Sequence, residues 1–96
     1  MATRVQLDFS NLTVDDHDRV CEALDFPDDW PDGLLAHTSA TVDGRLRVVD
    51  VWKSSGDFDR FLEERLGAAI GKAVGDRAEQ PQRTDSELHS FNAKAT

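Results

Sequence analysis

A histidine and an aspartate, His37 and Asp50, are the residues of this chain best placed for chemistry. The dipeptide Asp43-Gly44 separates two runs of strand-forming residues, which is a strong signal for a two-residue hairpin turn. Such a turn places His37 directly opposite Asp50 on one face of the sheet, with Cβ atoms about 5 Å apart. A carboxylate at this distance can hydrogen-bond an imidazole, raise its proton affinity and fix its orientation. The pair therefore has the composition of a general base and its orienting group.

A set of further side chains extends this pair into a candidate site. Asp50 lies on an expected central strand, where a buried, unpaired carboxylate would be costly, so it needs a partner such as His37. Residues on the first, third and last expected strands could line a cavity beside the pair: Gln6, Asp8, Trp52 and His89. We predict that His37 and Asp50 are catalytic and that these four residues bind a ligand.

Four of these residues also have a purely structural interpretation. His37 and Asp50 could form a cross-strand pair that only stabilises the sheet. They could also belong to a metal site, but no ligand spacing supports one, and we predict no metal ligands. Trp52 could belong to the core or to a dimer interface, and His89 could be an exposed residue of an edge strand.

The elements that must position the pair follow from the hydrophobic periodicity. Residues 4–9 alternate between apolar and polar side chains, as a half-buried strand does. Thr13 and Asp16 form a capping-box pattern, and Ser54 caps a second amphipathic helix that ends at Gly75. The expected elements are strand 4–9, helix 14–24, strand 33–42, strand 45–52, helix 55–74 and strand 86–92.

This β-α-β-β-α-β order predicts an α+β, ferredoxin-like fold, in which a four-stranded antiparallel sheet carries both helices on one face. The strands at 4–9 and 45–52 are expected at the centre of the sheet and parallel to one another. Apolar residues point to both faces of strand 45–52, so the helix-free face needs a second layer. A copy related by a two-fold axis is the simplest such layer, and we predict a homodimer.

The run VVDVWKSSGDFDRFLEERLGAAIGKAV, residues 48–74, resembles the third strand and second helix of the dimeric α/β-barrel superfamily. The nearest likeness is to antibiotic-biosynthesis-monooxygenase-like proteins. The order of the elements extends this resemblance over most of the chain. It implies a dimeric α/β barrel with the active site in the cavity between the two sheets. The superfamily includes monooxygenases, haem-degrading enzymes, isomerases and uncharacterised members, so the resemblance implies a fold more than a function.

These observations favour a protein that binds a small hydrophobic or aromatic molecule in the cavity between the sheets. One alternative is a cofactor-independent monooxygenase or isomerase that acts on an aromatic or polyketide-like compound. Another is a structural or regulatory dimer whose barrel is filled by side chains. We expect no cofactor, because the chain has neither a phosphate-binding glycine loop nor a dinucleotide motif.

Size and charge argue against several other classes. With 96 residues, the chain is expected to form one domain, residues 1–96. Its net charge of −8 disfavours binding to nucleic acid or to anionic membranes. No apolar run is long enough for a transmembrane helix, and the first residues lack a signal-peptide pattern, so we expect a cytoplasmic protein. With one cysteine, Cys21, the chain cannot form an internal disulfide, and we expect no cysteine-based zinc site.

Overall fold

A computed structural model describes residues 2–94 and contains the predicted order of strands and helices. The second helical segment has three parts, α2, the π-helical η1 and α3, which follow one another without a break. In chain order the elements are β1 (Thr3–Asp8), α1 (Val14–Leu24), β2 (Leu34–Val42), β3 (Arg45–Trp52), α2 (Ser55–Phe61), η1 (Leu62–Leu66), α3 (Gly67–Val74), the short 3₁₀ helix η2 (Gly75–Arg77) and β4 (Gln82–Glu87).

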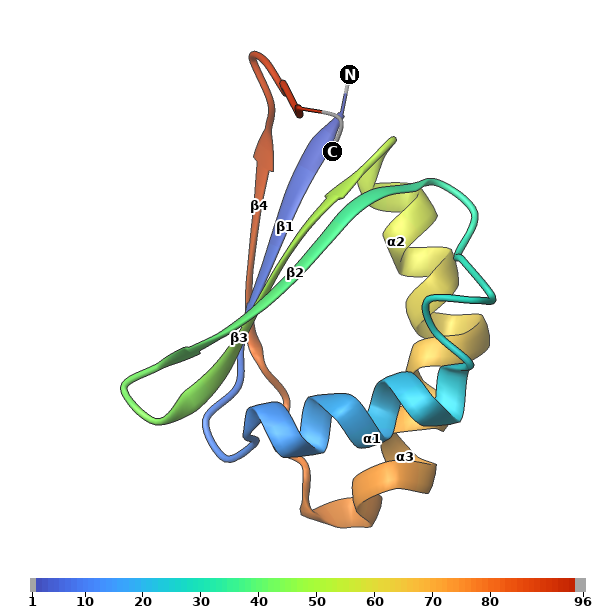
Figure 1. Cartoon of the computed structure of the whole chain (residues 1–96), viewed down its shortest axis with the longest axis vertical. Helices are drawn as coiled ribbons and strands as arrows, with labels where there is room; N and C mark the ends of the chain where they lie inside the picture. Colours follow the sequence, from blue (N-terminus) through green and yellow to red (C-terminus); the bar gives the residue numbers. More distant parts are fainter. Residues whose placement is uncertain (1, 95–96) are drawn as a thin grey trace.

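The four strands form one antiparallel sheet in the order β2-β3-β1-β4, and the helices cover one of its faces (Figure 1). This is the predicted ferredoxin-like arrangement. The strands β1 and β3 are central, as expected, but the prediction that they run parallel was wrong, because they are antiparallel. The connections explain this direction. The crossover through α1 makes β1 and β2 run the same way, and the tight hairpin then reverses β3.

The β2–β3 hairpin has the predicted turn and register. Asp43 and Gly44 both have positive φ, at 53° and 76°, as a two-residue turn that matches the sheet twist requires. His37 is the register partner of Asp50, as predicted. An irregularity between Leu34 and Ala36 then shifts the ladder by one residue. Because of this bulge, the register that the turn imposes holds from Val42 back to Ala36 and does not reach Leu34, the first residue of β2.

The helix starts follow the capping signals. The backbone N–H of Thr13 donates to Asp16 Oδ2 at 3.0 Å, and the backbone N–H of Asp16 donates to Thr13 Oγ1 at 3.4 Å. Ser54 Oγ likewise accepts from the backbone N–H of Asp57 at 3.1 Å. The second helical segment ends before Gly75, whose φ is 64°. None of the helices within residues 2–94 is long and apolar enough to cross a membrane.

The last strand lies earlier in the chain than predicted. β4 spans residues 82–87, not 86–92, and every residue in it is exposed. Its sequence, QRTDSE, is polar throughout, so it carries no apolar alternation from which a strand could be recognised. Backbone pairing with β1 holds it in place, with Gln6 opposite Thr84. Arg83 adds a contact on the helix side, because its guanidinium lies 4.8 Å from the ring centre of Phe58.

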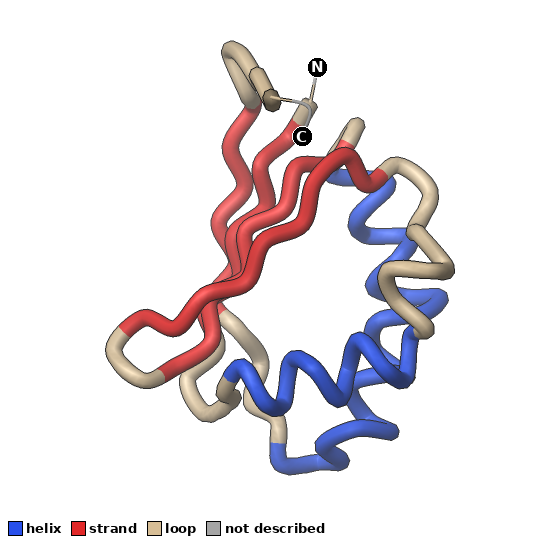
Figure 2. The backbone as a smooth tube through the Cα atoms, viewed as in Figure 1, coloured by secondary structure: helices blue, strands red, loops and turns tan. Residues whose placement is uncertain are grey.

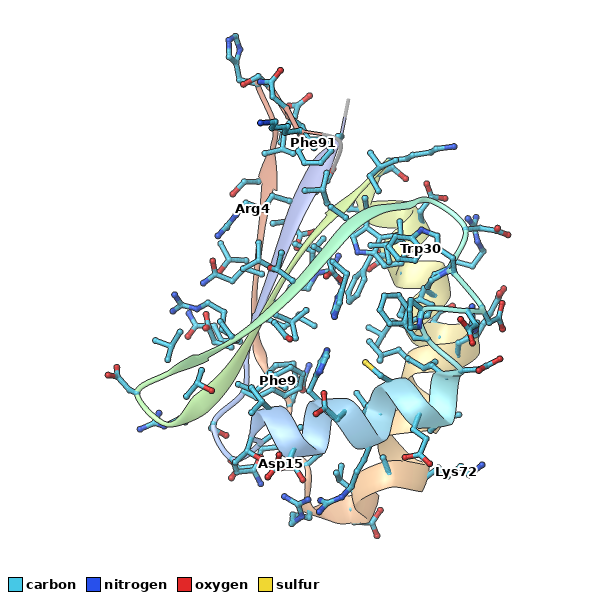
Figure 3. The ribbon with its side chains drawn as sticks, viewed as in Figure 1. Arg4, Phe9, Asp15, Trp30, Lys72 and Phe91 are labelled. Atoms are coloured by element: carbon cyan, nitrogen blue, oxygen red, sulfur yellow. The ribbon has the colours of Figure 1, made fainter. Side chains whose placement is uncertain are left out.

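The two faces of the sheet differ sharply in polarity. The helix side holds the core, whose most completely buried side chains are Val5, Leu12, Trp52 and Phe58. Figure 2 shows the helices gathered on this side of the sheet, and in Figure 3 Arg4 lies on the opposite side. The helix-free face was predicted to be apolar enough to need a second layer. It instead carries polar side chains of β1 and β4, and β3 supplies half-buried Val49 and Val51 together with Arg47.

Candidate functional site

An apolar pocket lies between the sheet and the helices. Its volume is about 70 Å³. Aliphatic and aromatic side chains from β1, β3 and the helices form most of its wall, and Phe9, which follows the end of β1, lies between the sheet and α1 (Figure 3). The apolar residues that line it are Leu7, Phe9, Leu12, Val20, Leu24, Phe26, Pro31, Leu34, Leu46, Val48, Trp52, Phe61, Leu66 and Ile70.

The polar groups of the pocket are connected on one part of its wall. His37 Nδ1 and Asp50 Oδ1 are 2.7 Å apart, so the predicted cross-strand pair forms a hydrogen bond. The second carboxylate oxygen, Asp50 Oδ2, accepts a hydrogen bond from Trp52 Nε1 at 3.3 Å. Asp50 is buried, with an exposed fraction of 6%. Both of its oxygens therefore have partners, which is what a buried carboxylate requires.

A second histidine, His17, joins the pair from helix α1. The Nε2 atoms of His17 and His37 are 2.9 Å apart, and the two ring planes differ by only 7°. The rings meet edge to edge, at a distance at which one N–H···N hydrogen bond joins them. In the neutral state His37 carries its hydrogen on Nδ1, facing Asp50, so His37 Nε2 is the acceptor and His17 Nε2 donates. The result is a hydrogen-bonded chain from α1 through β2 to β3.

Cys21 lies one helical turn beyond His17, on the same side of α1. Its Sγ is 3.5 Å from His17 Nε2. Burial raises the pKa of the Cys21 thiol, with smaller contributions in the same direction from Asp18 and Asp50. Burial is also the largest effect on His17, and it lowers the pKa of that imidazole. Both effects favour the uncharged form of each group, which is consistent with an apolar pocket wall.

A short loop, residues 25–33, covers one side of the pocket. Phe26 packs its ring edge-on against His37, with centroids 5.0 Å apart, and stacks against Trp30. Trp30 in turn donates from Nε1 to the backbone oxygen of Leu34 at 2.8 Å. Arg65, in the π-helical turn η1, donates to the backbone oxygen of Leu24 at 3.1 Å and to Asp29 Oδ2 at 3.0 Å. Figure 2 shows this loop running beside the second helical segment.

Solved structures resemble this chain over its whole length. Rv0793 from Mycobacterium tuberculosis is 15% identical, with a TM-score of 0.66 and coverage of 97% of this chain and 100% of that one. A Chloroflexus aurantiacus protein, provisionally described as an antibiotic biosynthesis monooxygenase, is 14% identical, with a TM-score of 0.67 and coverages of 97% and 98%. A Bacteroides fragilis protein of unknown function, described as dimeric with a ferredoxin-like fold, is 12% identical, with a TM-score of 0.65 and coverages of 91% and 96%.

The chain shares their ferredoxin-like fold. No family model matches the sequence, and no curated protein matches it. At identities of 12–15% the likeness establishes the fold alone. The predicted fold and its resemblance to monooxygenase-like structures are confirmed at this level.

Within the ferredoxin-like fold, five of the six predicted site residues divide into two groups. His37, Asp50 and Trp52 lie together at the pocket, on the helix side of the sheet. Gln6 and Asp8 do not line it. Val5 is the register partner of Asp50, and successive residues of a strand point to opposite faces, so Gln6 and Asp8 face the helix-free side. One cavity of this chain therefore does not hold all six residues.

The two excluded β1 residues belong to a separate polar network on the helix-free face. Gln6 Nε2 donates to Asp8 Oδ2 at 2.8 Å, and Arg47 Nε donates to Asp8 Oδ1 at 2.6 Å. The hydrogen bond from Arg47 is the main cause of a lowered pKa at Asp8. His89 belongs to neither group, because it is exposed and follows the end of β4. The binding roles predicted for Gln6, Asp8 and His89 remain predictions.

Sequence reasoning missed His17 as a member of the site. This residue lies on the inner stripe of α1, the side of the helix that faces the pocket. The spacing of His17 and Cys21, four residues apart on that stripe, is a detectable signal, because residues at this spacing share one helix face. What the sequence does not contain is the docking of α1 over β2, which brings His17 to His37.

Proposed function

We propose that the protein binds a small, largely apolar molecule in the pocket between its sheet and its helices. The observation that supports this most directly is the contrast within the pocket. An apolar wall carries one connected polar group, formed by His17, His37 and Asp50. Binding sites for small organic molecules commonly combine such a wall with a few convergent polar groups that orient the ligand.

The size of the pocket limits the ligand class. About 70 Å³ is well below the roughly 300–1,000 Å³ of pockets that hold drug-sized ligands. A single small aromatic ring is therefore the favoured occupant, and a larger compound requires the loop of residues 25–33 to move. Phe26 and Trp52 provide aromatic surfaces beside such a ring. This pocket lies on the opposite side of the sheet from the cavity expected between two paired sheets.

Catalysis in the same pocket is the second candidate function. The His37–Asp50 hydrogen bond favours it, because a carboxylate that orients an imidazole next to a bound molecule is the arrangement of a general base. The likeness to a structure described as a monooxygenase agrees with this candidate. The reaction class would be cofactor-independent oxidation or isomerisation of an aromatic or polyketide-like compound. A structural or regulatory dimer with a filled pocket is the remaining alternative.

Fluorescence of Trp52 tests the binding proposal. The chain has two tryptophans, so Trp30→Phe leaves Trp52, on the pocket wall, as the only one. Phenol, benzyl alcohol and benzaldehyde are titrated into this variant in the presence of EDTA. We expect a saturable change in emission. Adding His37→Ala should weaken binding roughly tenfold, as the loss of one hydrogen bond does, whereas Lys72→Ala, on the exposed side of α3, should not.

Two results would contradict the binding proposal. One is the absence of saturable binding for every compound, which would support the filled dimer. The other is equal affinity for the His37→Ala and Lys72→Ala variants, which would mean that His37 does not contact the ligand. Mass spectrometry of the same compounds after incubation in air separates binding from turnover. A product that wild type forms and His37→Ala does not would support the enzymatic candidate.

A further inference from the structure

We propose that His17, Cys21 and His37 form a binding site for a transition metal ion, with Zn²⁺ as the best fit. The three ligand atoms lie within 4.8 Å of one another, at the wall of the pocket. Imidazole and thiolate are the ligands that zinc prefers in proteins. This proposal does not depend on the binding of a small organic molecule.

Two of the three distances among the donors are close to those of a zinc site, and the third is below 4.8 Å. Zinc–nitrogen bonds of about 2.0–2.1 Å and a zinc–sulfur bond of about 2.3 Å, at tetrahedral angles, place two nitrogens about 3.4 Å apart and a nitrogen and a sulfur about 3.6 Å apart. The observed separations are 2.9 Å between the two Nε2 atoms and 3.5 Å between Cys21 Sγ and His17 Nε2. Small side-chain rotations that separate the two rings would admit the ion.

The surroundings of both histidines orient them as metal ligands. Asp50 Oδ1 lies 2.7 Å from His37 Nδ1, and Asp18 Oδ1 lies 3.4 Å from His17 Nδ1. Each imidazole thus has a carboxylate on Nδ1 and directs Nε2 toward the other ring. A carboxylate on the second nitrogen is the usual companion of a zinc-bound histidine, because it fixes the tautomer and the ring direction. Trp52 holds Asp50 in turn.

The placement of the donors on regular elements favours a preformed site. His17 and Cys21 are four residues apart on α1, and His37 is on β2, so two packed elements fix all three donors. Phe26 packs over His37 and limits access of water to it. Three protein ligands leave one tetrahedral position open, and all three residues line the pocket, so that position is available to water or to a molecule in the pocket.

Ion binding requires two protons to move. Cys21 loses its thiol proton to solvent as the thiolate binds the ion, and the proton on His17 Nε2 is exchanged for one on Nδ1, next to Asp18. No electron is transferred. The alternative is that the three side chains only form a hydrogen-bonded cluster in the apolar interior.

Cobalt and zinc titrations distinguish these two cases. Untagged protein, with no organic ligand present, is titrated with Co²⁺ and then with Zn²⁺. We expect one equivalent to bind, a thiolate-to-cobalt charge-transfer band to appear, and Zn²⁺ to displace Co²⁺. Cys21→Ser should remove the band. His37→Gln should weaken binding, and Asp50→Asn should weaken it by about 10- to 100-fold, as second-shell changes do. The control, Lys72→Ala, changes an exposed residue of α3 and should bind as wild type does.

A wild-type protein that binds no Co²⁺, or that binds it without the thiolate band, would overturn the proposal. So would equal Zn²⁺ affinity in wild type and Cys21→Ser, since that would place the ion elsewhere. Circular dichroism checks that each variant is folded. If a variant does not fold, the presence or absence of the thiolate-to-cobalt band in the wild type still decides the proposal. Because the organic-ligand titration uses EDTA, failure of one proposal leaves the other unaffected.

Discussion

Asp50 shows how a single buried residue depends on its register. It lies on a central strand, and its two oxygens are held by His37, across the hairpin, and by Trp52, two residues away on the same strand. Both contacts follow from local geometry, namely the two-residue turn and the period of a strand. The third member, His17, depends on how a helix docks, which is a long-range property. The residue pair was therefore predictable, whereas the three-residue cluster was not.

At the same scale, Asp16 should make the stability of the fold depend on pH. A hydrogen bond from Arg77, followed by the backbone bond from Thr13, lowers its pKa from 3.8 to about 2. Because the folded state has the lower pKa, this stabilisation is fully present above pH 4 and is lost as the pH falls toward 2. Asp16→Asn should destabilise the protein by on the order of 1 kcal/mol at pH 6, as the loss of a helix cap does. It should also reduce the fall in the free energy of unfolding between about pH 4 and pH 2.

Urea unfolding from pH 2 to pH 6, in EDTA, measures this dependence. Asp15→Asn is the matched control, because Asp15 is the exposed neighbour in the same first turn. If the free energy of unfolding of the two variants falls in parallel as the pH decreases, Asp16 is not the cause of the loss of stability in acid.

At the scale of elements, strong local signals were reliable and weak ones were not. The hairpin, both helix caps and the stop at Gly75 all rest on particular residue types, and the structure has them where predicted. The π-helical turn η1 was not predicted. One extra residue in a turn barely changes the spacing of the apolar residues, so the sequence pattern still predicts an ordinary α-helix. β4 was misplaced because a polar edge strand is fixed by pairing with β1 and not by its own side chains.

The second helical segment contains a glycine that its fold does not require. Gly71 is exposed within α3, and a Cβ there would contact nothing within 4 Å. Gly71→Ala should therefore raise the free energy of unfolding by roughly 0.5–1 kcal/mol, because alanine loses less backbone entropy on folding. Gly75→Ala should have the opposite sign, since Gly75 has a φ of 64°, which alanine disfavours. Urea unfolding compares the two, and a destabilised Gly71→Ala would imply an unrecognised close contact.

At the scale of the whole molecule, the helix-free face is the part that one chain leaves uncovered. The sequence predicted apolar residues on both faces of β3, and the structure has them there. The helix-free face as a whole is not apolar. Beside the valines that β3 supplies to this face, a network formed by Gln6 and Asp8 of the neighbouring β1 and Arg47 of β3 makes the face polar. The predicted homodimer would thus have Val49 and Val51 at its centre and charged pairs around them, which is the usual composition of an interface core and rim.

Sedimentation of a charged variant tests whether this face pairs two chains. Val49 is half-buried at the middle of the face, with Gln6 and Thr38 as its neighbours on the adjoining strands. If the wild type is a dimer, Val49→Glu would bring two carboxylates together in a desolvated interface, so it should sediment as a folded monomer at micromolar concentration. Ala68→Glu adds the same charge on the exposed side of α3 and should remain dimeric. A wild type that is monomeric at that concentration would reject the dimer, and a Val49→Glu variant that stays dimeric would move the interface to another surface.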